Sequence, residues 1–161
     1  MFITEKVVQA FNRQITQEYS NYLQYTAIAN YFSVENLRLL AGFYAKQAEE
    51  ERDHASRFTK FLIDSGAAVE IQATSAPQNK FANALEAVQS AYDAEVRTTN
   101  QIHALVDLAL SEKCHSAQQF LQWFVQEQVE EIATAESKLA ITKKAGNNLL
   151  SVEAYLAHGG G

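Results

Sequence analysis

The sequence predicts an all-α fold, an antiparallel four-helix bundle with one long crossover and a short fifth helix at its C-terminal end. The 161 residues include one Pro and six Gly, three of them at the very end, which is too little turn chemistry for many short strands. Apolar residues recur at helical spacing in four segments of about 30 residues each. We expect residues 1–161 to form a single domain, with the bundle over about 5–145.

Charge and composition exclude several classes of function. With 13 Lys and Arg against 19 Asp and Glu, the formal net charge is −6, which excludes a basic nucleic-acid footprint and favours cations as partners. No segment approaches the roughly 18 consecutive apolar residues of a membrane span, so we expect no membrane partner. The single cysteine cannot form an internal disulfide, and the first residues lack the apolar stretch of a signal peptide. A cytoplasmic protein is therefore expected.

The helix boundaries follow from start and stop signals along the chain. Thr4 followed by the acidic Glu5 is typical of a helix start. Gly66 and Gly146 each stand where a helical pattern stops, a position that glycine favours. The expected helices cover about 5–33, 35–65, 81–111, 116–145 and 149–158.

The segment between Gly66 and Lys80 is expected to be a long crossover. It carries the only proline and a short strand-like alternation, but no helical period. If largely extended, its roughly 15 residues can span the length of a bundle. The other links between long helices are too short for anything but antiparallel hairpins. The crossover therefore lets the third helix start at the same end as the first.

Each long helix carries an inward-facing apolar stripe that is interrupted by one glutamate near the middle of the helix. These glutamates are Glu18, Glu51, Glu95 and Glu131, and His54 follows Glu51 by one turn. On the third helix the expected stripe is Leu85, Val88, Tyr92, Glu95, Thr99, Ile102, Val106 and Ala109. Four carboxylates at one level of an apolar core repel one another and cost several kcal/mol each to desolvate, unless a cation lies among them.

Two structural alternatives compete with a metal site. One such glutamate alone is more often a partly exposed residue whose aliphatic stem touches the core. A buried ion-pair network needs inward Lys or Arg, whereas Arg52 and Lys138 are expected beside the stripes rather than on them. Hard oxygen ligands with one imidazole favour iron or manganese over a structural zinc. Glu51 and His54 at i and i+3 indicate two ions bridged by a carboxylate.

Three segments, FNRQITQEYSNYLQY, AEEERDHASRF and FLQWFVQEQVEEI, resemble the corresponding segments of the non-haem ferritins of bacterial type. The resemblance covers nearly the whole chain. It implies a ferritin-like domain that oxidises Fe(II) with O2 or peroxide at a di-iron ferroxidase centre and stores ferric mineral in a hollow homo-oligomeric cage of 24 subunits. Such a protein serves iron storage and detoxification.

The resemblance also implies ligands for two ferroxidase irons that share one glutamate, and for a third iron nearby. The ligands of the first iron are Glu18, Glu51 and His54. Those of the second are Glu51, Glu95 and Glu131, with Gln128 close by. Those of the third are Glu50, Glu127 and Glu130, for which a solvated or cavity-facing acidic surface is an equal alternative. Tyr25 either bonds to a ligand or gives an electron, or it is a core tyrosine with a satisfied hydroxyl.

Differences between this sequence and two related families favour the non-haem ferritins over both. Bacterioferritins carry Glu-x-x-His on both the second and the fourth helix, and they bind haem through a methionine between the glutamate and histidine of the second. Here the fourth helix has Gln128-x-x-Glu131, the methionine slot holds Arg52, and the only methionine is Met1. No haem is expected by that route. The twelve-subunit miniature ferritins place iron between subunits and lack a fifth helix, so the chain is more similar to the larger cages.

Two rival functions stay open. A di-iron oxidase or peroxidase of rubrerythrin type would be favoured by a second Glu-x-x-His or a Cys-x-x-Cys pair, and the sequence has neither. A helical scaffold with incidental glutamates is the non-enzymatic alternative. Cys114 and His115 fall in the link between the third and fourth helices, which is either an ion-entry point or an ordinary surface turn. The apolar tail LLSVEAYL predicts burial against neighbouring subunits.

Overall fold

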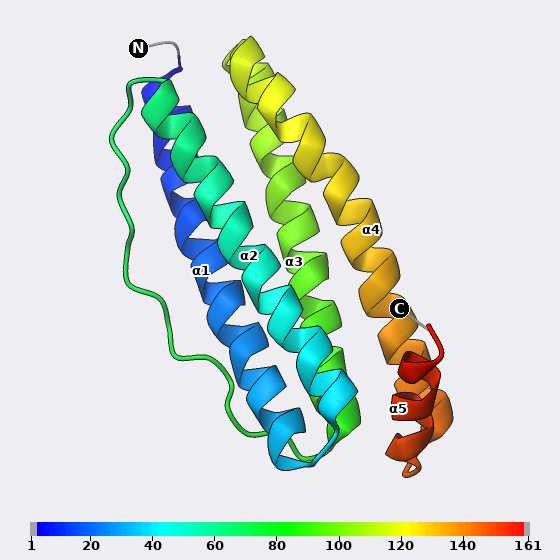
Figure 1. The fold of residues 1–161 in the computed structure, drawn as a ribbon. Coiled ribbons are helices and arrows are strands. Elements are labelled where there is room, and N and C mark those ends of the chain that lie inside the picture. Colours follow the sequence, from blue (N-terminus) through cyan, green and yellow to red (C-terminus); the bar gives the residue numbers. More distant parts are fainter. Residues whose placement is uncertain (1–2, 160–161) are drawn as a thin grey trace.

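The computed structural model describes residues 3–159, which form five α-helices and an extended crossover (Figure 1). The helices are α1 (Glu5–Val34), α2 (Arg38–Asp64), α3 (Ala84–Ser111), α4 (His115–Ala145) and α5 (Leu149–Ala157). Helices α1 and α2 form one antiparallel hairpin and α3 and α4 form another. The crossover joins α2 to α3 and runs along the outside of the bundle beside α1. The predicted four-helix bundle with one crossover is confirmed. Within residues 3–159, no helix is long and apolar enough to cross a membrane.

Side-chain caps and one turn decide where the helices begin. Thr4 Oγ1 accepts a hydrogen bond from the Val7 amide, so α1 begins where the sequence predicts. Asn83 Oδ1 accepts from the Glu86 amide at 2.9 Å, so α3 begins at Ala84 and the predicted start at residue 81 is three residues too early. The predicted start of α2 at residue 35 is also wrong, because Asn36 has a φ of 60°, outside the helical region.

The start of α2 is capped from the other end of the chain. Leu37, the residue before α2, makes no side-chain cap bond. Instead, the Glu153 carboxylate of α5 accepts hydrogen bonds from the backbone amides of Leu39 and Leu40, each at 2.9 Å. A negative charge is favourable at the positive end of a helix. The fifth helix therefore stabilises its own bundle.

Glu153→Ala is expected to lower the free energy of unfolding by about 1 kcal/mol, because it removes a charged helix cap. Chemical denaturation of the purified protein would measure the change. Glu136→Ala removes an exposed glutamate of α4 and serves as the control, with an expected change near zero. Equal changes in the two variants would contradict a capping role for Glu153.

Only part of α5 is buried in this chain. Val152 is buried against the bundle, whereas Leu150 and Tyr155 are 72% and 47% exposed. Burial of the tail against neighbouring subunits stays a prediction, and these two side chains are the ones it concerns.

The apolar core has two parts separated at mid-height. One cluster contains Phe11 and Phe58, and the other contains Phe32 and Tyr44. On each long helix the buried apolar residues of the two clusters leave a gap around the central glutamate. The core is therefore two hydrophobic halves with a polar layer between them.

The inward face of α3 differs from the predicted stripe. Leu85 is 38% exposed, and Tyr92, Thr99 and Val106 are only half-buried. The buried residues are instead Ala84, Ala87, Val88, Ala91, Ala94, Glu95, Thr98, Ile102, Leu105 and Ala109. Half of this inner face is alanine, so it cannot be located from the larger apolar side chains alone, some of which, such as Leu85, lie outside it. Glu95 lies on the inner face of α3 in the predicted stripe and in the structure.

Lys138 of α4 is also buried, contrary to the expectation that it lies beside the stripe. It is 1% exposed, and its Nζ lies 4.7 Å from the centre of the Phe43 ring. Burial lowers the pKa of this lysine.

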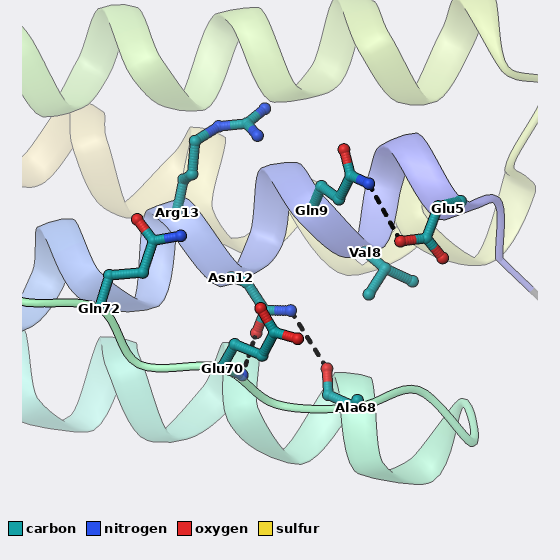
Figure 2. A pocket seen from close by; sticks show the side chains of 8 residues that line it. All are labelled: Glu5, Val8, Gln9, Asn12, Arg13, Ala68, Glu70 and Gln72. Carbon is teal, nitrogen blue, oxygen red and sulfur yellow. Dashed lines mark hydrogen bonds between the residues drawn. The ribbon is translucent and has the colours of Figure 1, made fainter.

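The crossover is bound to α1 through side chains rather than through a second strand. Asn12 donates its amide to the Ala68 carbonyl at 3.1 Å and accepts from the Glu70 amide at 2.8 Å, as Figure 2 shows. Farther along, the Gln72 amide donates to Thr16 and the Gln78 backbone bonds to Gln24. The strand-like alternation therefore produces an extended segment whose partners are polar side chains of one helix.

Candidate metal centre

The polar layer at mid-height is made by one glutamate from each long helix. All four are buried, with exposed fractions of 0% for Glu18, 2% for Glu51, 2% for Glu95 and 6% for Glu131. Each is held between the two apolar clusters by the inward stripe of its helix. The structure thus brings together the four carboxylates that the sequence placed at one level.

One compact group in this layer combines Glu18, Glu51 and His54, which offer one ligand-type atom each within 4.8 Å of one another. His54 Nδ1 lies 3.8 Å from Glu51 Oε2 and has no hydrogen-bond partner, although the side chain is 3% exposed. An unsatisfied buried nitrogen costs about 1–3 kcal/mol, so such an atom fits a metal ligand. The rings of Trp123 and Phe124 lie 5.6 and 5.7 Å from the His54 ring and form its apolar wall.

The other nitrogen of His54 faces a second group of carboxylates. His54 Nε2 lies 3.9 Å from Glu127 Oε1, and His54, Glu127 and Glu131 also offer three atoms within 4.8 Å of one another. The sequence placed Glu127 only with a separate third ion. In the structure, His54 links that outer group to the inner one.

The predicted trio of Glu51, Glu95 and Glu131 is more open. Among the described residues these three do not form a group as tight as the other two. The Tyr25 hydroxyl donates to Glu95 Oε1, and Gln128 Nε2 donates to Glu95 Oε2 at 3.2 Å. Hydrogen bonds from neighbouring side chains thus hold Glu95 toward Tyr25 and Gln128.

Every one of the four carboxylates accepts a hydrogen bond from a carboxamide. The pairs are Gln14 with Glu18 at 2.8 Å, Asn21 with Glu51 at 3.1 Å, Gln128 with Glu95 at 3.2 Å and Gln47 with Glu131 at 3.1 Å. A carboxamide donates without adding a charge, so it orients a carboxylate and leaves its charge for a cation. Sequence reasoning missed Gln14, Asn21 and Gln47, although each lies three or four residues from a buried glutamate on its own helix.

Burial raises the pKa of all four glutamates, and repulsion within the layer raises it further for Glu18, Glu51 and Glu131. Burial is the main cause for Glu18, Glu51 and Glu95, and the charge of Glu51 raises the pKa of Glu18 further. Burial and then the charge of Glu95 raise the pKa of Glu131 to about 8. Burial and Glu95 also raise the pKa of Tyr25, so its hydroxyl keeps its proton. The layer therefore retains protons that a divalent cation would displace.

An acidic cavity of about 320 Å³ lies between α2 and α4, beside the buried layer. Its lining includes Glu50, Glu127 and Glu130 together with Glu131 of the layer. Gln47 donates to both Glu50 and Glu131, at 3.2 and 3.1 Å. The predicted third-ion residues thus border one cavity, and it reaches the centre through Glu131.

Other residues that the sequence singled out lie outside this layer. Arg52, in the slot of the haem methionine, pairs with Glu49 at 2.6 Å on the outside of α2. Cys114 is buried, with its Sγ 3.7 Å from Ser116 Oγ, in the turn between α3 and α4 where Lys113 is exposed. His115 is exposed.

Comparison with known proteins agrees with this architecture. The family model described as "Ferritin-like domain" matches residues 8–145. Ferritin BfrB of Mycobacterium tuberculosis is 38% identical over 144 residues, which cover 89% of this chain and 80% of that protein. The bacterial non-heme ferritin of Staphylococcus aureus is 31% identical over 153 residues, covering 95% and 92% of the two chains.

A solved structure shows the same fold. The open-pore ferritin of Archaeoglobus fulgidus superposes with a TM-score of 0.93 at 34% sequence identity, and the match covers 96% of each chain. The region that the family model matches, residues 8–145, contains all four glutamates of the buried layer. This chain belongs to the ferritin family.

Proposed function

We propose that this protein stores iron: it oxidises Fe(II) at the buried carboxylate layer and holds the ferric product as mineral inside a cage of 24 subunits. The convergence of four glutamates and His54 from four helices in a buried layer carries the proposal. Family membership supports it further. The single cysteine fits a reducing compartment, so we propose the cytoplasm as its location.

In this proposal Fe(II) is the substrate, and two ions bind before oxidation. Glu18, Glu51 and His54 take the first ion, and Glu51, Glu95 and Glu131 take the second. Each ion gives one electron to O2, and the two electrons with two protons yield hydrogen peroxide; if peroxide is the oxidant, two electrons and two protons yield two waters. Carboxyl groups with raised pKa values can supply protons when the ions bind.

The acidic cavity is the proposed place of a third ion and a path from the layer toward the mineral. Glu50, Glu127 and Glu130 supply hard oxygen ligands, which suit iron and exchange readily. His54, with one nitrogen toward each group, separates the inner ion from this outer one.

Two measurements on the purified protein test the proposal together. Light scattering should give a particle of 24 subunits of 18.0 kDa each, about 430 kDa in total. On aerobic addition of Fe(II), the ferric absorbance should keep increasing after far more than two irons per subunit have been added. A small particle that retains only two irons per subunit would contradict storage and favour a di-iron oxidase with fixed metals.

The two ions are expected to bind unequally. The first set includes an imidazole and is already gathered within 4.8 Å, whereas the second is all oxygen and more open. Anaerobic titration with Fe(II) by calorimetry should resolve two affinities, and Glu95→Ala should abolish only the weaker. Glu136→Ala, an exposed glutamate on α4, is the matched control and should change neither. Loss of both steps in Glu95→Ala would contradict an exchangeable second iron.

A further inference from the structure

We propose that Asn21 of α1 is a positioning residue of the metal centre. Its carboxamide holds Glu51, the carboxylate shared by both proposed ions, in the orientation that binds them. Asn21 is 5% exposed, and its Nδ2 lies 3.0 Å from Thr98 Oγ1, 3.1 Å from Glu51 Oε2 and 3.4 Å from Glu18 Oε2. One side chain of α1 thus contacts α2 and α3 in the buried layer. The inference rests on the function proposed above.

The orientation of the Asn21 amide is fixed by Gln17. Gln17 Nε2 donates to Asn21 Oδ1 at 3.1 Å, which leaves the NH2 group of Asn21 facing the two carboxylates. The flipped amide would place two NH2 groups together and an oxygen against carboxylate oxygens. Because Oδ1 is engaged by Gln17, Asn21 acts through the glutamates rather than as a metal ligand.

The two amide hydrogens are divided among three acceptors. The shorter contacts, to Thr98 and Glu51, take one hydrogen each, and the longer contact to Glu18 is weaker. Thr98 is 2% exposed on α3, so it anchors Asn21 from the side opposite α2. Asn21 therefore fixes Glu51 more firmly than Glu18.

The bond from Asn21 aims a Glu51 oxygen at the cation position without blocking it. The same Glu51 Oε2 lies 3.8 Å from the unpartnered Nδ1 of His54. A carboxylate oxygen has two lone pairs, so one accepts from Asn21 and the other stays available to an ion beside His54. Hydrogen bonds of this kind to metal ligands change affinity about 10-fold to 100-fold when they are removed.

Since Glu51 is shared, loss of the Asn21 bond should weaken both ions. We expect Asn21→Leu to raise the dissociation constants of both binding steps by about 10-fold, whereas Glu95→Ala affects only the second. The experiment is an anaerobic titration of the assembled protein with Co(II), a spectroscopic substitute for Fe(II). The visible absorption of the first Co(II) should also change in shape or intensity, because its Glu51 ligand is reoriented.

Asn12→Leu is the matched control. Asn12 lies on the same helix, is also 5% exposed, and bonds to the crossover backbone instead of the centre (Figure 2). It should keep both affinities and the Co(II) spectrum even where it lowers stability. Asn21→Ala is the second variant if the leucine is not accommodated, and circular dichroism verifies the fold of each.

The outcomes separate this proposal from the proposed function. Unchanged Co(II) affinities and spectrum in both Asn21 variants, with binding lost in Glu51→Ala, would overturn the role of Asn21 and leave the metal centre in place. Equal weakening in Asn12→Leu would overturn it as well, because the effect would then be general. Failure of the unmodified protein to bind Co(II) or Fe(II) would instead overturn the proposed function.

Discussion

Glu51→Ala is expected to slow Fe(II) oxidation on the order of 100-fold, the largest loss from any single substitution in the centre. Glu51 is the proposed ligand shared by both ions, and it also accepts the hydrogen bond from Asn21. Its removal weakens both sites and leaves a cavity beside Glu18 and His54. Stopped-flow absorbance after mixing anaerobic protein plus Fe(II) with O2 measures the rate.

Glu49→Ala is the control for that experiment. Glu49 lies two residues away on the same helix, is also a glutamate and pairs with Arg52 on the exposed side of α2. Its removal should leave the rate within about twofold, since an exposed ion pair contributes little. Oxidation at the unmodified rate in Glu51→Ala would show that the centre lies elsewhere.

The second large effect concerns pH, because without metal the buried glutamates make the protein less stable as pH rises. A carboxyl whose pKa is higher in the folded than in the unfolded chain stabilises the fold while it is protonated. That stabilisation is complete below the unfolded pKa and is lost as pH rises through the folded pKa. The pKa of Glu131 rises from an ordinary value of 4.5 to about 8 in the folded chain. The loss of folding free energy across that pH interval is on the order of 5 kcal/mol. Glu18, Glu51 and Glu95 act in the same direction.

Thermal unfolding between pH 5 and pH 8.5, with a chelator present, tests this expectation. The midpoint should fall as pH rises, and added Co(II) should restore it most at the alkaline end, where the carboxyls ionise easily. Glu131→Gln keeps the shape without the titrating group and should flatten the slope. A midpoint that rises with pH in the chelated protein would mean that the carboxylates are stabilised without a cation.

The sequence predicts the bundle well because helical periodicity, caps and loop length are local signals. The sequence predicts less well those features that depend on contacts between distant segments of the chain. The cap of α2 comes from Glu153, more than one hundred residues away along the chain. The predicted start of α3 is wrong for a different reason, because it follows apolar spacing and the local cap is Asn83. The inner face of α3 is marked by alanines, whose small contribution to periodicity hides it.

The residues of the candidate centre also divide into those that the sequence predicts and those that only the structure shows. Glutamates on apolar stripes stand out in a sequence, so Glu18, Glu51, Glu95 and Glu131 can be picked from spacing alone. Carboxamides do not stand out, because Gln and Asn are common on exposed helix faces and only their three-dimensional partners show their role. The link from His54 to Glu127 likewise depends on the packing of α2 against α4.

The way in which the crossover is bound has a consequence for sequence divergence. Asn12, Thr16 and Gln24 bond to backbone groups of the crossover, not to its side chains. Backbone groups are the same for nearly every amino acid, so these bonds restrain the three positions of α1 more than the crossover residues, apart from Ala67 and Val69, which pack against the core. Homologous chains should therefore vary more in the exposed residues of the crossover than at Asn12, Thr16 and Gln24 of α1.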